Sequence, residues 1–211
     1  NTQAMSDVDR CEQEPALARQ MNVDTIAHMV DALKSSGTLL VHVSTDYVFD
    51  GTQGAAYSEL DEPNPISVYG TSKLEGEQVA LRYPRAVVVR TSTLFGPGRM
   101  NFCDHIVSGL RAGQPVEAFT DQVTSPTYTQ DLAEAIGALC VMLERSHDAQ
   151  WPHLYHISNA GGCSRVAFAE RVADLLGCAR DLIYGIPISA QNRPARRPAY
   201  SALRSVHLPR V

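Results

Sequence analysis

The first 90 residues alternate between helical and strand-like patterns of hydrophobic positions. Within residues 15–36, apolar side chains recur at helical spacing, and Gly37 is placed to end that helix. Residues 38–43 form a short run rich in strand-forming residues, which predicts a strand buried on both faces. Residues 67–81 then predict a second helix, and residues 86–90 a second buried strand. This order of elements indicates an α/β fold with a parallel sheet.

The second half of the chain shows the same kinds of pattern with shorter elements. We predict helices over residues 101–112, 130–143 and 165–176, and strands over residues 115–119, 154–157 and 182–186. The Pro- and Arg-rich residues 192–198 predict a loop.

Composition narrows the functional classes without naming one. The 211 residues are 44% hydrophobic and 19% charged with a net charge of -5, which suggests neither a nucleic-acid nor a membrane partner. No metal-ligand spacing is found among the seven histidines, so we expect no metal site. Five scattered cysteines lack a C-x-x-C pair, which favours a reducing cytoplasm: Cys11, Cys103, Cys140, Cys163 and Cys178.

Candidate chemistry follows the first predicted strand. Thr45 comes directly after that strand, where ligands bind in open parallel sheets. Tyr69 and Lys73 are four residues apart on the next predicted helix and therefore share one face. A lysine ammonium near a phenol lowers the tyrosine pKa, so this pair predicts a proton donor active near neutral pH.

Several motifs around these residues resemble one family. Residues 44–51 read STDYVFDG, and Asn64-Pro65 and Tyr69-Gly70-x-x-Lys73 follow in order. Further matches include Arg90-Thr91-Ser92, Ser125-Pro126-Thr127 and Arg196-Arg197-Pro198. The pattern resembles the dTDP-4-dehydrorhamnose reductases, members of the extended short-chain dehydrogenase/reductase superfamily.

The resemblance implies NADPH-dependent reduction of the C4 ketone of a dTDP-linked 4-keto-6-deoxyhexose by a cytoplasmic enzyme. Catalysis would use Tyr69 as proton donor, Thr45 to hold the same oxygen, and Lys73 to hold the nicotinamide ribose. Cofactor contacts are expected from Asn1, Thr2, Gln3, Ser44, Tyr69, Lys73 and Arg90. Substrate contacts are expected from Asp46, Tyr47, Thr93, Arg196 and Arg197. NADH is the alternative cofactor, while a Mg²⁺ ion and a homodimer are left open.

The resemblance also implies a domain plan. Residues 1–95 and 126–160 correspond to the C-terminal part of a Rossmann-type NADP-binding domain, and residues 96–125 and 161–211 to a nucleotide-sugar-binding lobe. The family's Gly-x-x-Gly-x-x-Gly loop and first βαβαβ half, about 60 residues, do not occur in this sequence. We therefore expect a chain incomplete at both ends that, by itself, binds NADPH weakly, folds poorly and is inactive.

Three alternatives stay open at this stage. Thr93 stands where the family usually has a tryptophan against the sugar, so another deoxysugar 4-ketoreductase fits as well. The regulatory subunit of methionine adenosyltransferase resembles the same family without being an enzyme; the Thr45, Tyr69 and Lys73 set favours a reductase. A nucleotide-sugar epimerase or dehydratase is a further possibility, and Asp46-Tyr47 argues against a dehydratase, which usually has an Asp-Glu pair there.

Overall fold

The centre of the protein is a parallel three-stranded sheet. A computed structural model describes residues 1–145 and 151–208. The strands lie in the order β1 (Leu40–Thr45), β2 (Ala86–Thr91) and β7 (Leu154–His156). Thr45 pairs with Thr91, and Arg90 with His156, so the carboxyl ends of the three strands lie side by side. The α/β fold with a parallel sheet is therefore confirmed.

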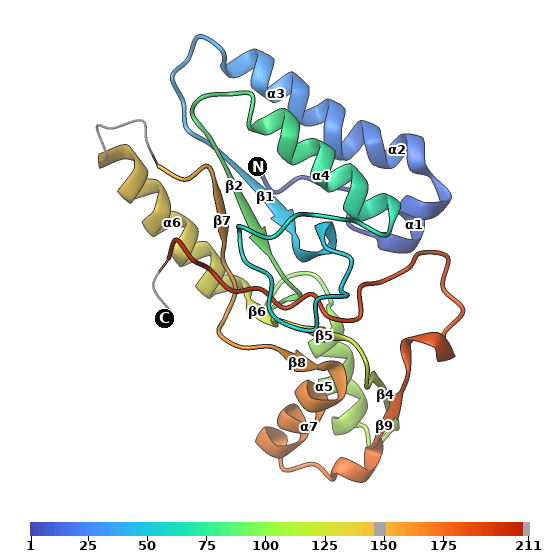
Figure 1. The fold of residues 1–211 in the computed structure, drawn as a ribbon. Coiled ribbons are helices and arrows are strands. Elements are labelled where there is room, and N and C mark those ends of the chain that lie inside the picture. The colour runs from blue at the N-terminus through green and yellow to red at the C-terminus, as the bar shows by residue number, and fades with distance from the viewer. Residues whose placement is uncertain (146–150, 209–211) are drawn as a thin grey trace.

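Helices cover both faces of this sheet (Figure 1). On one face, α3 (Thr25–Leu33) and α4 (Val68–Ala80) pack through a cluster that includes Ile26 and Val88. On the other face, α6 (Thr129–Arg145) packs through a cluster that includes Val87 and Val89. Successive strand side chains point to opposite faces, so the continuous apolar run of β2 supplies both cores.

The predicted helix over residues 15–36 is one helical path with a wider turn inside it. It consists of α2 (Pro15–Arg19), the π-helical turn η1 (Gln20–Asp24) and α3. The wide turn directs Asn22 inward, where its amide hydrogen-bonds the Met5 backbone and the Ser72 hydroxyl. A further helix, α1 (Val8–Gln13), precedes it and was not predicted as a separate element. Hydrophobic periodicity did not predict the wide turn, because the turn is held by the hydrogen bonds of a buried polar side chain, which a pattern of apolar positions does not report.

A smaller lobe lies beyond the carboxyl ends of the strands (Figure 1). Its core joins α5 (Phe102–Arg111), β4 (Val116–Phe119), α7 (Arg165–Leu176) and β9 (Ile183–Ile186), with β4 and β9 parallel. These four elements agree with the predicted helices and strands to within one residue at either end. The remaining short elements are η2 (Asp46–Val48), β3 (Leu94–Phe95), β5 (Val123–Thr124), β6 (Thr127–Tyr128), β8 (Cys163–Ser164), η3 (Arg180–Leu182) and η4 (Ile188–Ala190).

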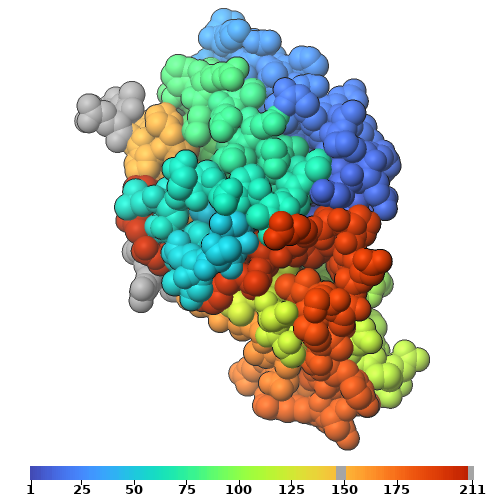
Figure 2. Space-filling view, turned by 45° about the vertical axis from the view of Figure 1, so that its right-hand side comes forward, coloured from blue at the N-terminus to red at the C-terminus, as the bar shows by residue number. Residues whose placement is uncertain are grey.

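The C-terminal segment runs back from the lobe to the sheet, across the junction between the two parts (Figure 2). Tyr57 donates its backbone N–H to Ala202, and Val123 donates to Ala199. Leu203 packs with the Phe49 and Tyr57 side chains beside the sheet. Residues 201–208 thus contact the sheet part, although the predicted division groups them with the lobe. That division stays a prediction, and its residues 146–150 and 209–211 lie outside the described ones.

Candidate active site

The predicted catalytic residues come together where β1 meets α4. Thr45 ends β1, and its hydroxyl accepts the Tyr47 N–H at 3.2 Å. Ser67 caps α4 by accepting the Gly70 N–H, which sets Tyr69 in the first turn of the helix. The Tyr69 ring meets the Tyr47 ring edge-on, with 5.7 Å between centroids. Thr45 and Tyr69 are close enough for a hydrogen bond between their side chains, which lowers the pKa of the phenol in part.

Lys73 lies one turn beyond Tyr69 and is buried. Its Nζ donates to the Val43 carbonyl of β1 at 2.7 Å. Burial lowers the pKa of Lys73 to about 8, while the nearby Glu77 acts in the opposite direction. The pKa of Tyr69 is raised, chiefly by burial. The expected lowering of the Tyr69 pKa by Lys73 is therefore corrected: desolvation dominates, and the ammonium is directed to Val43.

Asp46 lies beneath the site. Its carboxylate is only 2% exposed and accepts hydrogen bonds from the hydroxyls of Thr45, Ser92 and Ser201. Burial raises its pKa against these three hydrogen bonds. The expected contact between Asp46 and the sugar stays a prediction; in this structure the carboxylate faces the interior and links β1, the end of β2 and the C-terminal segment.

Arg90 also has a different setting from the one expected. Its guanidinium forms a two-pronged ion pair with Glu77, with side chains 4% and 2% exposed. It also lies 5.2 Å from the Phe49 ring centroid. The expected cofactor contact stays a prediction: here the Arg90 charge is balanced in a buried ion pair between β2 and α4, and its Nη1 has no partner among the described residues.

The other expected cofactor residues lie on β1 or along the edge of β1 that does not pair with β2. The backbone of Asn1 bonds to Val41 and Val43, and Thr2 and Gln3 follow it as exposed residues. Val43 therefore joins this segment to Lys73, because its carbonyl accepts the ammonium. Ser44 is buried, and its hydroxyl has no hydrogen-bond partner among the described residues.

Two residues of the site were not predicted from the sequence. Gln122 donates its amide to the Tyr47 hydroxyl at 3.2 Å, and Arg165 donates to the Gln122 oxygen and to Thr93. Thr93 itself adopts a positive φ of 41°, which is uncommon for a β-branched residue. Gln122 lies three residues before the Ser125-Pro126-Thr127 motif, which is the only sequence signal near it, and Arg165 gave no signal beyond its position after Ser164.

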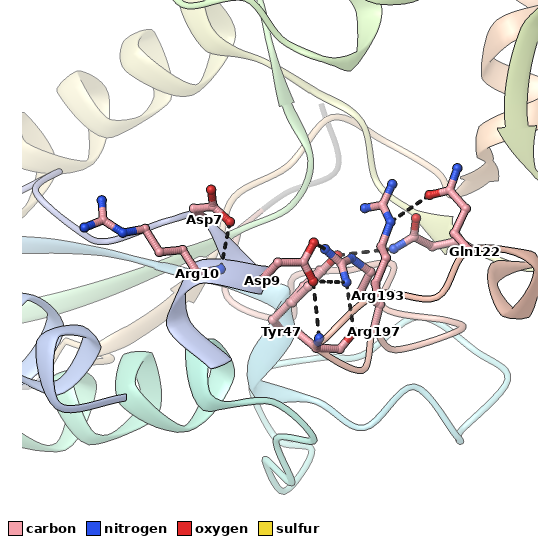
Figure 3. A network of polar contacts seen from close by, with 9 residues as sticks. Asp7, Asp9, Arg10, Tyr47, Gln122, Arg193 and Arg197 are labelled. Carbon is pink, nitrogen blue, oxygen red and sulfur yellow. Dashed lines mark hydrogen bonds and ion pairs between the residues drawn. The ribbon is translucent and has the colours of Figure 1, made fainter. Parts of the chain in front are cut away.

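The two expected substrate arginines differ from one another. Arg197 forms a two-pronged ion pair with Asp9 of α1, and the Ala195 N–H donates to the same carboxylate (Figure 3). Arg196 is exposed. The pair fastens the loop that follows Gln191 across the site from α1, close to Tyr47 and Gln122 (Figure 3).

Residues 1–145 and 151–208 contain neither a metal-binding cluster nor a helix able to span a membrane. No group of three or more His, Cys, Asp or Glu side chains in these ranges is arranged to hold a metal ion. Within the same ranges, every helix is too short or too polar to cross a membrane.

The whole chain, residues 1–211, matches the family model described as "RmlD substrate binding domain". The chain belongs to this family. It is 38% identical to dTDP-4-dehydrorhamnose reductase of Mycobacterium tuberculosis, over 97% of this chain and 67% of the relative. It is 36% identical to spore coat polysaccharide biosynthesis protein SpsK of Bacillus subtilis, over 96% of this chain and 69% of the relative.

Solved structures of RmlD-family proteins share the fold. One is dTDP-4-dehydrorhamnose reductase from Bacillus anthracis in complex with NADP, with a TM-score of 0.87 and 31% identity over 96% of this chain and 69% of the other. A dTDP-glucose 4,6-dehydratase from Streptomyces venezuelae, at 20% identity and a TM-score of 0.73, shares the Rossmann-like fold alone.

Proposed function

We propose that this chain carries the catalytic residues of an NADPH-dependent ketoreductase that acts on the C4 ketone of a dTDP-4-keto-6-deoxyhexose. The reaction is that of dTDP-4-dehydrorhamnose reductase. The observation that carries the proposal is the convergence of Thr45, Tyr69 and Lys73 at the carboxyl end of β1. Membership of the RmlD family supports the same reaction.

In this proposal Tyr69 is the proton donor. Burial keeps its pKa above the ordinary value, so the phenol is fully protonated at neutral pH. A substrate carbonyl oxygen within reach of Tyr69 and Thr45 accepts two hydrogen bonds once the Thr45 hydroxyl turns from Asp46 to the substrate. These bonds strengthen as negative charge develops on that oxygen. Tyr69 then transfers its proton to the alkoxide, and Thr45 holds the oxygen in line.

Lys73 and Ser44 suit a nicotinamide ribose. The ammonium of Lys73 has three N–H donors, and Val43 takes one of them. The Ser44 hydroxyl is buried without a partner among the described residues, so a ribose hydroxyl fits its needs. NADPH, when bound, supplies the hydride to the C4 carbon. Asn1, Thr2 and Gln3 are proposed to flank the same cofactor, because their segment runs beside Val43.

The identity of the hexose is the open part of the proposal. Thr93 presents a small hydroxyl side chain to Arg165 and Gln122, so this wall of the site is polar. A polar wall can hydrogen-bond more hydroxyl groups of the sugar than an aromatic wall can. The bound hexose can therefore differ from the one that the rhamnose enzymes reduce, and a reductase of another 4-keto deoxysugar is the second candidate. Cytoplasmic location stays a prediction, and a homodimer and a Mg²⁺ ion stay open alternatives.

The test measures NADPH consumption by the full-length gene product, with a panel of dTDP-4-keto-6-deoxyhexoses as substrates. Tyr69→Phe removes the proton donor, so we expect kcat to fall by about 10²- to 10⁴-fold while NADPH affinity stays within about twofold. Tyr83→Phe is the matched control, because that phenol is also buried but donates to Thr38 far from the site. Full turnover by Tyr69→Phe, or no NADPH consumption by the unmodified protein, contradicts the proposal; the second result favours a regulatory subunit.

A further inference from the structure

Glu77 of α4 is a buried carboxylate that the proposed mechanism does not use. Its side chain is 2% exposed and accepts two hydrogen bonds from the Arg90 guanidinium, at 3.0 Å from Nε and 2.7 Å from Nη2. Glu77 lies one helical turn beyond Lys73, so the two side chains lie on the same face of α4, and both are buried. The catalytic ammonium therefore has a buried carboxylate as its neighbour along the helix.

The sheet fixes two cations near this carboxylate. The Nζ of Lys73 donates to the Val43 carbonyl of β1 at 2.7 Å. Ser44, the next residue of β1, pairs in register with Arg90 of β2. The ammonium and the guanidinium are thus held at neighbouring points of two adjacent strands. Glu77 pairs directly with Arg90 and acts on Lys73 through space, so one carboxylate is shared by two buried cations.

The groups that β1 and the N-terminal segment bring to Lys73 carry no negative charge. His42 of β1 is buried, and burial, with a smaller effect of Lys73, lowers its pKa to about 3, so the imidazole is neutral. The Asn1 amino group is neutral or positive, and its pKa is lowered by burial and by Lys73. Neither group can therefore balance the charge of Lys73.

The groups on the helical side are uncharged as well. Burial raises the pKa of the Tyr69 phenol and that of the Cys11 thiol, the latter to about 11, so both stay protonated. Asn22 of η1 contributes only an amide. Among the described residues, Glu77 is therefore the carboxylate whose charge opposes the effect of burial on Lys73.

Removal of Glu77 would leave two buried cations at this junction. Arginine does not release its proton in proteins, whereas a buried lysine does so readily. The proton would therefore be lost from Lys73 and not from Arg90. Since burial already lowers the pKa of Lys73 to about 8, a further decrease would leave the amine largely uncharged at neutral pH.

We propose that Glu77 is a positioning residue of the active site, which keeps Lys73 in its ammonium form and so able to hold the nicotinamide ribose. This inference rests on the proposed function, which assigns that contact to Lys73. Arg90 acts in the opposite sense, because its positive charge offsets much of the field of the Glu77 carboxylate. Removal of one or the other member of this ion pair should therefore change the charge state of Lys73 in opposite directions.

The test measures the NADPH dissociation constant of the full-length gene product from about pH 6 to about pH 10. In the unmodified protein, affinity should fall with a midpoint at about pH 8, where Lys73 loses its proton. Glu77→Gln should move this midpoint to lower pH by about one unit or more, and Arg90→Met should move it to higher pH. A purely structural ion pair would behave differently, because both substitutions break the same contact and would change the affinity at every pH.

Glu75→Gln is the matched control, because Glu75 lies on the same helix but is exposed and pairs with Arg19 at the surface. It should leave the midpoint unchanged. The double variant Arg90→Met/Glu77→Leu removes both buried charges and leaves burial alone to act on Lys73. Its midpoint should lie between those of Glu77→Gln and Arg90→Met, and it keeps the test decisive if Glu77→Gln does not fold.

Opposite shifts of the midpoint in Glu77→Gln and Arg90→Met support the proposal. It is overturned if the midpoint of Glu77→Gln stays unchanged or moves to higher pH. Where Glu77→Gln does not fold, a midpoint of Arg90→Met no higher than that of the double variant overturns it. A Glu75→Gln midpoint that moves as far as that of Glu77→Gln also overturns it, because any carboxylate of the helix would then have the same effect.

Urea unfolding without NADPH separates this proposal from the proposed reaction. A lysine whose pKa is lowered in the folded protein makes stability rise with pH above that pKa. The rise should therefore begin at lower pH in Glu77→Gln and at higher pH in Arg90→Met. If these shifts occur but no NADPH is bound and no 4-keto sugar is reduced, the effect of Glu77 on Lys73 stands and the ketoreductase proposal fails. If the sugars are reduced and neither measurement responds to Glu77→Gln, the ketoreductase proposal stands and the role of Glu77 fails.

Discussion

Asp9 and Arg197 are 188 positions apart in the sequence, and they form a two-pronged ion pair that joins α1 to the loop before the C-terminal segment. The guanidinium side chain is 7% exposed and the carboxylate side chain 31% exposed. The pair therefore holds a loop of the lobe against the sheet part, beside Tyr47 and Gln122 (Figure 3).

Asp9→Asn should loosen this loop. Since the variant leaves Arg197 covered without a full negative partner, we expect the free energy of unfolding to fall by about 1–3 kcal/mol in urea denaturation. The pKa of Asp9 is lowered mainly by Arg197, so the contribution is present above the carboxyl's ordinary pKa and is lost as the pH falls through the lowered value.

Glu14→Gln serves as the control for Asp9→Asn. It removes an ion pair with Arg10 on the neighbouring helical turn, where both side chains are exposed. Such surface pairs contribute little to the free energy of unfolding, because water and salt screen them. Equal losses in Asp9→Asn and Glu14→Gln would mean that the Asp9–Arg197 pair is no more than a surface interaction.

Lys73 should give the protein a stability that rises in mildly alkaline solution. Its pKa is about 8 in the folded protein, below the ordinary value of 10.5. Between these pH values the unfolded chain binds more protons at this position, so stability increases with pH, by about 3 kcal/mol in total. Below about pH 8 the buried ammonium carries its full desolvation cost.

The comparison is between the unmodified protein and Lys73→Met, unfolded in urea from pH 7.5 to 10. The stability advantage of Lys73→Met should shrink as the pH rises. A difference that stays constant with pH contradicts the lowered pKa of Lys73. Activity should move the other way. Because the charged form of Lys73 holds the ribose in the proposed mechanism, kcat/KM should decline as the pH passes about 8.

Removing one member of the buried Arg90–Glu77 pair should be costly. Glu77→Gln leaves the Arg90 charge buried without its partner, and we expect a loss of about 3–5 kcal/mol in the free energy of unfolding. The double variant Arg90→Met/Glu77→Leu should be clearly more stable than Glu77→Gln, since apolar side chains leave no buried charge. A double variant as unstable as the single one would show that packing, and not charge, dominates here.

Gly70 permits the close approach of α4 to η2. A Cβ at this position would lie 2.2 Å from the Tyr47 carbonyl oxygen, so Gly70→Ala must push the helix and Tyr47 apart. We expect a loss of about 1–3 kcal/mol together with reduced kcat, because Tyr69 is the adjacent residue. Gly137→Ala in α6 is the control: its Cβ meets nothing within 4 Å, and alanine should stabilise that helix by about 0.5–1 kcal/mol. Similar effects of Gly70→Ala and Gly137→Ala on kcat contradict the idea that the close contact at Gly70 positions Tyr69.

Local pattern predicted most of the secondary structure. The strand over residues 86–90 and the helix over residues 67–81 were predicted to within one residue at each end, because an unbroken apolar run and a serine cap are local signals. The wide turn at Asn22 was missed, since its cause is a hydrogen bond to Ser72, 50 positions away.

The sequence by itself determined the α/β fold, the family and the residues at the β1–α4 junction, since strand ends and the i, i+4 spacing of Tyr69 and Lys73 are local properties. Only the tertiary structure decided how the charges are used. Arg90, Arg165 and Arg197 are the same residue type in the sequence. In the structure Arg90 pairs with Glu77 and Arg197 pairs with Asp9, whereas Arg165 has no carboxylate partner among the described residues. The fate of a charge depends on which distant groups share its low-dielectric surroundings, and spacing along the chain does not encode that.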